Sequence, residues 1–159
     1  MQILYRISSN SYDKARLPSA TKENCLDNFI ENVVSKSDYM TIIADNVDMQ
    51  LMEFIRSRAC DNIGVSEHNL GSNGASFRHQ LDLASAFPDD EIILLQEDDY
   101  FHKPAGWPYK GNTTYTQLLE EVLEKSDYAS LYDHPDKYIA PDFGGNKYIS
   151  DDGIENTGV

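Results

Sequence analysis

The feature of this sequence that most constrains its fold is an alternation of short apolar runs with longer amphipathic stretches. Apolar runs that suit strands occur at five places, at residues 3–7, 39–44, 63–65, 91–96 and 128–132. Between these runs, apolar residues recur at helical spacing in four stretches, of which residues 21–36 form the first. This order predicts an α/β fold, in which a mostly parallel sheet has helices on both faces.

Local signals support individual elements of this pattern. Asp48 can cap a helix that carries Leu51 and Ile55, and Thr114 with Gln117 makes a capping box for the last predicted helix. The run at residues 91–96 is apolar almost throughout, which predicts a parallel strand buried on both faces.

Charge and length exclude several classes of function. The chain has 27 Asp and Glu against 13 Lys and Arg, a formal net charge of −14, which disfavours binding to nucleic acid. The longest apolar run, residues 92–95, is too short to span a membrane, and the N-terminus does not resemble a signal peptide. Cys25 and Cys60 lack metal-site spacing and predict buried thiols in a reducing compartment. We therefore expect a cytoplasmic protein.

Polar clusters follow the predicted strands, at residues 8–10, 45–46, 67–74, 97–99 and 133–134. Ligands of open α/β sheets bind beyond the carboxyl ends of the strands. The three consecutive carboxylates Glu97, Asp98 and Asp99 oppose each other's ionisation unless a cation or hydrogen bonds compensate them. Oxygen ligands suit Mg²⁺ or Mn²⁺, so the cluster predicts a divalent metal site. A solvated acidic loop is the alternative interpretation.

An apolar strand followed by Glu97, Asp98 and Asp99 resembles the DxD position of GT-A type glycosyltransferases, in an EDD form. Asp45 after the second strand is similar to the acidic position at which that family recognises the nucleotide base. Residues 69–74, with the pattern N-x-G-x-N-G, resemble the stretch before the family's third helix. The similarity covers residues 3–138. The Arg-Ile-Ser end of the first strand departs from the family pattern and leaves the identity of the base open.

The resemblance implies a GT-A (nucleotide-diphospho-sugar transferase, Rossmann-like) fold and metal-dependent transfer of a sugar from a nucleoside diphosphate sugar to a hydroxyl of a glycan or other acceptor. Asp99 would be the ligand of Mn²⁺ or Mg²⁺. The implied nucleotide-sugar site gathers residues at or after the ends of successive strands, namely Ile7, Ser8, Asp45, Asn73, Glu97 and Asp98.

The acceptor side is less well defined by the sequence. Asp133, after the run at residues 128–132, is the best-placed acid for a catalytic base. We predict a nucleotide-sugar-binding core over residues 1–138 and an irregular, partial acceptor-side segment over residues 139–159. A sugar nucleotidyltransferase would need a glycine-rich loop after the first strand, and residues 8–11 contain no glycine. A non-catalytic or truncated GT-A-like binding module is the alternative function.

Overall fold

The computed structural model describes residues 1–9, 18–105, 113–130, 147–149 and 155–157, and its contacts divide the chain into two compact units, Met1–Glu121 and Val122–Val159. The strands of the first unit are β1 (Gln2–Ile7), β2 (Tyr39–Asp45), β3 (Ile63–His68) and β4 (Ile93–Glu97). Its helices are α1 (Lys22–Asn32), α2 (Met49–Arg56) and α3 (Asn73–Ala84), and α4 (Tyr115–Leu123) runs from the first unit into the second.

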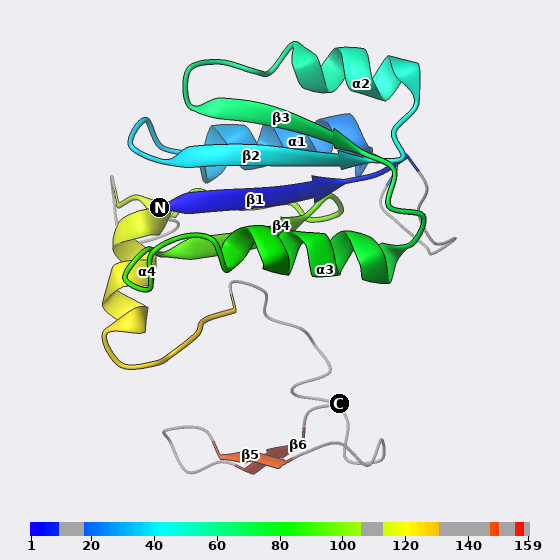
Figure 1. Ribbon diagram of the computed structural model, residues 1–159. Helices are drawn as coiled ribbons and strands as arrows, with labels where there is room; N and C mark the ends of the chain where they lie inside the picture. The colour runs from blue at the N-terminus through cyan, green and yellow to red at the C-terminus, as the bar shows by residue number, and fades with distance from the viewer. Residues whose placement is uncertain (10–17, 106–112, 131–146, 150–154, 158–159) are drawn as a thin grey trace. The chain divides into compact units, whose positions relative to one another are not determined.

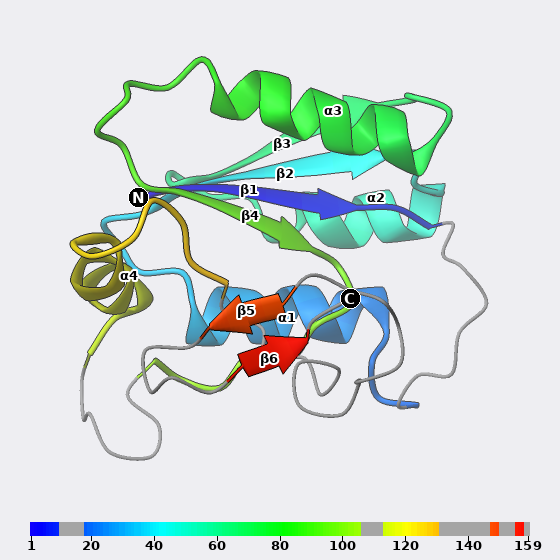
Figure 2. The same ribbon diagram turned by 90° about the horizontal axis from the view of Figure 1, so that it is seen from below.

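The four strands of the first unit form a parallel sheet in the order β3-β2-β1-β4. Helices α1 and α2 cover one face and α3 covers the other (Figures 1 and 2). The predicted α/β class is therefore confirmed. The chain runs outward from β1 to β3 and then returns to place β4 on the other side of β1. The strand order thus reverses between β1 and β4, and such a switch point is where ligands bind in open α/β sheets.

Strand β1 forms the centre of the hydrophobic core, with Ile3 and Ile7 fully buried. The ring of Tyr5 packs on Phe29 of α1, with ring centroids 5.1 Å apart. Other buried side chains come from α1, β2 and α2 and include Leu26, Ile42, Ile43 and Ile55. Burial of these apolar groups between the sheet and its helices is the main force that stabilises the first unit.

Two elements expose more apolar surface than their sequences predict. Strand β4 is one of the two edge strands of the sheet and Leu95 is 37% exposed, so the prediction of a strand buried on both faces is wrong. In α3 the side chains of Phe77 and Leu81 are 44% and 43% exposed, while Gln80 is buried. Gln80 Nε2 donates a hydrogen bond of 2.7 Å to the Leu4 carbonyl of β1, so an amide lies where an apolar side chain is expected.

The predicted helix caps are confirmed. Asp48 accepts a hydrogen bond of 2.9 Å from the Leu51 amide at the start of α2. Thr114 and Gln117 bond reciprocally, because the Thr114 amide donates to Gln117 Oε1 at 3.0 Å and the Gln117 amide donates to Thr114 Oγ1 at 3.2 Å. These bonds satisfy amides that a helix N-terminus leaves without an intrahelical acceptor.

Other predictions fail. Residues 128–130 have no regular secondary structure and are exposed, so the predicted strand is absent there, and residues 131–132 lie outside the described residues. The second unit contains an antiparallel pair formed by β5 (Lys147–Ile149) and β6 (Glu155–Thr157).

Cys25 is buried as predicted, whereas Cys60 is exposed. No helix within the described ranges has the length and hydropathy that a membrane crossing requires.

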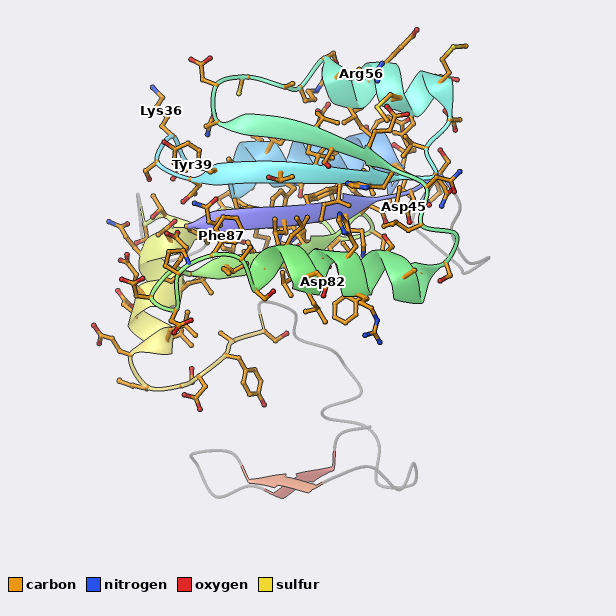
Figure 3. The ribbon with its side chains drawn as sticks, viewed as in Figure 1. Lys36, Tyr39, Asp45, Arg56, Asp82 and Phe87 are labelled. Atoms are coloured by element: carbon orange, nitrogen blue, oxygen red, sulfur yellow. The ribbon has the colours of Figure 1, made fainter. Side chains whose placement is uncertain are left out.

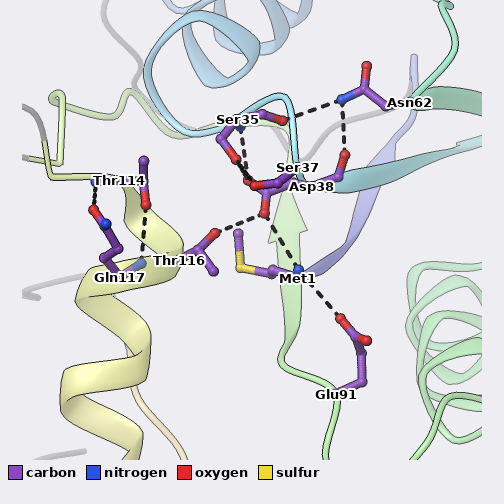
Figure 4. A network of polar contacts seen from close by, with 9 residues as sticks. All are labelled: Met1, Ser35, Ser37, Asp38, Asn62, Glu91, Thr114, Thr116 and Gln117. Atoms are coloured by element: carbon purple, nitrogen blue, oxygen red, sulfur yellow. Dashed lines mark hydrogen bonds and ion pairs between the residues drawn. The ribbon is translucent and has the colours of Figure 1, made fainter.

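A polar network centred on Asp38 lies at the amino ends of the strands (Figure 4). Asp38 is 1% exposed, and its Oδ2 accepts hydrogen bonds from the amide and hydroxyl of Ser35 at 2.9 and 2.8 Å. Its Oδ1 accepts a bond of 2.8 Å from Thr116 of α4 and lies 3.6 Å from the amino group of Met1. The network joins β1, the α1–β2 turn and α4. Figure 3 shows Tyr39 and Asp45 at opposite ends of β2, so this network lies away from the carboxyl edge.

Candidate functional site at the carboxyl ends of the strands

The loops that follow β1 and β4 contact each other at the switch point. The backbone amide of Ser8, directly after β1, donates a hydrogen bond of 2.9 Å to Oδ2 of Asp98, directly after β4. These two residues are separated by 90 positions in the sequence. The acidic cluster therefore lies at the carboxyl edge of the sheet, as the sequence predicts, and beside the point where the strand order reverses, which the sequence does not predict.

Lys22 compensates the charge of Asp98. The Lys22 ammonium lies 2.5 Å from Oδ1 of Asp98, and the two side chains are 15% and 13% exposed. Thr21 caps α1 by accepting a bond from the Asn24 amide, which places Lys22 in the first turn of the helix. The carboxylate of Asp98 therefore has a backbone donor on one oxygen and a cation on the other.

Arg6 compensates the charge of Glu97 and ties both residues to α3. Arg6 and Glu97 are Cα partners in the β1–β4 register, and their side chains form an ion pair. The other terminal nitrogen of Arg6 donates to the carbonyl and side-chain oxygens of Asn73, the first residue of α3, at 3.0 and 2.5 Å. Arg6 is 7% exposed, so a buried guanidinium connects β1, β4 and the start of α3.

Asp45 organises the adjoining part of the carboxyl edge. Its side chain is 3% exposed, and Oδ1 accepts hydrogen bonds from the Leu70 amide at 2.8 Å and from Asn46 Nδ2 at 3.0 Å. Asn46 adopts a left-handed conformation with φ of 53°, which asparagine tolerates better than most residues. Asp45 therefore supports the loop between β3 and α3, a role that sequence reasoning did not assign to it.

The remaining predicted residues lie in different settings. Ile7 is fully buried in the core, so its side chain is not accessible to a ligand. Asp99 is partly buried beside the switch point. The predicted catalytic base Asp133 lies outside the described residues. Within the described ranges, no three His, Cys, Asp or Glu side chains are grouped so that they could hold a metal ion together.

A buried hydroxyl lies beneath the acidic cluster. The hydroxyl oxygen of Tyr5 is buried and has no hydrogen-bond partner in the part of the chain that the structure describes. Burial, and secondarily the negative charge of Asp98, raises the pKa of Tyr5 far above its ordinary value. The phenol is therefore neutral throughout the physiological pH range and cannot supply a negative charge to the site.

Sequence reasoning missed the two cations of this site. Arg6 stands in an otherwise apolar strand, and that local exception is a usable signal, because a buried arginine needs acceptors. Lys22 follows the capping residue of a helix, where a cation interacts unfavourably with the helix dipole and therefore suggests another partner.

Comparisons with known proteins find two distant relatives of the chain. No protein-family profile and no solved structure matches the chain. Two curated proteins from two strains of Mycobacterium tuberculosis, each named an uncharacterized glycosyl hydrolase, are 22% identical to it over 138 residues. The match covers 80% of this chain and 17% of each relative, so the chain spans about a sixth of the length of these relatives.

Proposed function

We propose that this chain provides the donor site of a metal-dependent glycosyltransferase, which transfers a sugar from a nucleoside diphosphate sugar to an acceptor hydroxyl. The observation that carries the proposal is the hydrogen bond from Ser8 to Asp98. It joins the loops after β1 and β4 at the switch point of a parallel sheet, the position where open α/β folds bind nucleotides.

The neighbouring side chains suit the parts of such a ligand. Ser8 follows β1 and Asp45 is the last residue of the adjacent strand β2, and a carboxylate there can accept N–H groups of uracil or guanine. Oδ1 of Asp45 holds Leu70 and Asn46, and the base would use the other oxygen. Glu97 and Asp98 would bind the ribose, the sugar hydroxyls or metal-bound water. Asn73 is linked to Glu97 by Arg6, which contacts both side chains.

The residues fit a metal ion only together with a diphosphate. Arg6 and Lys22 already compensate Glu97 and Asp98, and the described residues offer no cage of three protein ligands. Mg²⁺ and Mn²⁺ commonly bind through one or two carboxylates plus substrate phosphates, and Asp99 would be the protein ligand in such a complex. When bound, the ion would stabilise negative charge on the leaving diphosphate.

The names of the two matched relatives give modest support to a carbohydrate-active enzyme, because both are called glycosyl hydrolases. Catalysis would also need a base for the acceptor hydroxyl, and Asp133 remains our prediction for that role. A second candidate function is a non-catalytic GT-A-like module. The ion pairs of Arg6 and Lys22 favour it, since they balance two of the three clustered acids without a metal.

Calorimetry with uridine diphosphate and guanosine diphosphate, with Mn²⁺ and then with excess chelator, tests the proposal. We expect one of the nucleotides to bind only with the metal, and Asp99→Asn to remove this binding while the melting temperature stays the same. Equal affinity in chelator would refute metal dependence. Binding without sugar transfer to any acceptor, unchanged by Asp133→Asn, would favour the non-catalytic module.

A further inference from the structure

The two cations at the switch point differ in how their hydrogen-bond donors are used. Arg6 donates to two oxygens of Asn73 and pairs with Glu97, and its Nε is buried. The ammonium of Lys22 carries three donors, and Asp98 is the partner that the described residues give it. Counting the partners among the described residues, Lys22 has donors left for an anionic ligand while it keeps its ion pair.

We infer that Lys22 binds the diphosphate of the donor, an inference that rests on the proposed nucleotide-sugar site. Its ammonium contacts Asp98, and the other oxygen of Asp98 is held by the Ser8 amide. The ammonium thus lies at the switch point, beside the loop that follows β1. A chain with a formal charge of −14 has a strongly unfavourable overall field for a diphosphate, so a cation fixed at this point matters more than one elsewhere.

The ion pair also prepares Lys22 for binding. Both side chains are largely buried, at 15% and 13% exposure, and a pair removed from water in this way costs desolvation free energy. In return, Asp98 holds the flexible lysine side chain in one position. A ligand that meets a preordered cation loses less conformational entropy on binding than one that must order it.

A matched control is available in Lys36, which is exposed in the turn between α1 and β2. Figure 3 shows Lys36 at the end of the sheet opposite Asp45. Lys22→Gln and Lys36→Gln change the net charge equally, so a difference between them reports the position of the charge.

The test measures the affinity of uridine and guanosine diphosphates, with Mn²⁺, for the wild-type chain and both variants. Uridine and guanosine serve as probes without phosphate. We expect Lys22→Gln to lower the affinity for whichever diphosphate binds by about 10- to 100-fold, as loss of a charge-assisted hydrogen bond implies. The affinity for the nucleoside, and all affinities of Lys36→Gln, should stay the same.

The outcomes separate this inference from the proposed function. If the wild-type chain binds neither diphosphate, both fail. If it binds one and Lys22→Gln binds it equally well, only the inference fails. An equal loss for nucleoside and diphosphate would make Lys22 a support for Asp98 and would also overturn the inference. If Lys22→Gln folds poorly, the double variant Lys22→Gln with Asp98→Asn removes the carboxylate that the first change leaves unpaired. Compared with Asp98→Asn alone, the double variant must then lose affinity for the diphosphate and keep its affinity for the nucleoside.

Discussion

Arg6 and Glu97 stand opposite each other in the parallel β1–β4 pair, and their side chains form an ion pair. Arg6 is buried and needs acceptors from the protein, whereas Glu97 is 48% exposed and can also contact water. A second ion pair between an arginine and a glutamate, Arg56 with Glu67, is exposed at both ends and has a distance of 2.9 Å. The two pairs allow a direct comparison.

Arg6→Met should lower the free energy of unfolding by about 1–3 kcal/mol, because it removes charge-assisted bonds to Asn73 and Glu97. Arg56→Met should cause little measurable change, since exposed ion pairs contribute little to stability. Urea unfolding of both variants, followed by circular dichroism, measures the difference. Equal effects would show that the Arg6 contacts do not stabilise the β1–β4 edge.

Tyr5→Phe should leave the stability unchanged or raise it by up to about 1 kcal/mol, because the Tyr5 hydroxyl is buried and has no partner in the described residues. Tyr115 supplies the contrast, since its hydroxyl donates a hydrogen bond of 2.5 Å to the Lys103 carbonyl. Tyr115→Phe should therefore lower the free energy of unfolding by about 1 kcal/mol. Thermal melting of the two variants checks the expected order, and a clear loss in Tyr5→Phe would mean that its hydroxyl has a partner.

Asp45→Asn should keep the fold and weaken nucleotide binding. The substituted side chain retains an oxygen for the Leu70 amide, but it places an N–H donor where the second carboxylate oxygen would face the base. We expect the diphosphate to lose about 1–3 kcal/mol of binding free energy in calorimetry. Asp45→Ala should differ, because it leaves the Leu70 amide without this acceptor and so also lowers the melting temperature. Unchanged affinity in Asp45→Asn would place the base elsewhere.

Acidification should destabilise the protein through His102. This side chain packs against Phe29, and burial lowers its pKa below the ordinary range. Between the lowered pKa and the value of an unfolded histidine, about 6.5, the unfolded chain binds more protons than the folded chain. Stability therefore falls as the pH falls through this window. The free energy of unfolding should be measured at about pH 7.5 and at about pH 5.5. Its decrease from the higher to the lower pH should be smaller in His102→Gln than in wild type. Equal decreases in the two proteins would exclude His102 as a cause of the loss of stability at low pH.

Much of the fold follows from local patterns in the sequence. The positions of β1, β2 and β3 and the caps at Asp48 and Thr114 were predictable, because strand runs and N-caps depend on residues close together in the chain. The exposure of β4 was not predictable in this way. It depends on where the strand lies in the sheet order, and the apolar run itself does not encode that order.

The candidate site was likewise predictable from the sequence in one part and not in another. The placement of acids after strands predicted that Asp98 would lie at the carboxyl edge of the sheet, where the structure has it, but not that it would bond to the Ser8 amide. The cations that compensate the cluster could not be identified, because their pairing depends on tertiary contacts between distant segments. Lys22 and Asp98 are brought together by the docking of α1 on the sheet, and no local periodicity encodes that contact.

The network around Asp38 has a consequence for how the first unit folds. One oxygen of Asp38 binds Ser35, three residues away, while the other binds Thr116, 78 residues away. The local bonds can form as soon as the turn forms, but the distant bond must wait until α4 docks, after the loop-closure entropy has been overcome. A fragment that ends before α4 would leave this buried carboxylate short of a donor. We therefore expect a fragment that ends before α4 to be less stable than one that includes the start of this helix.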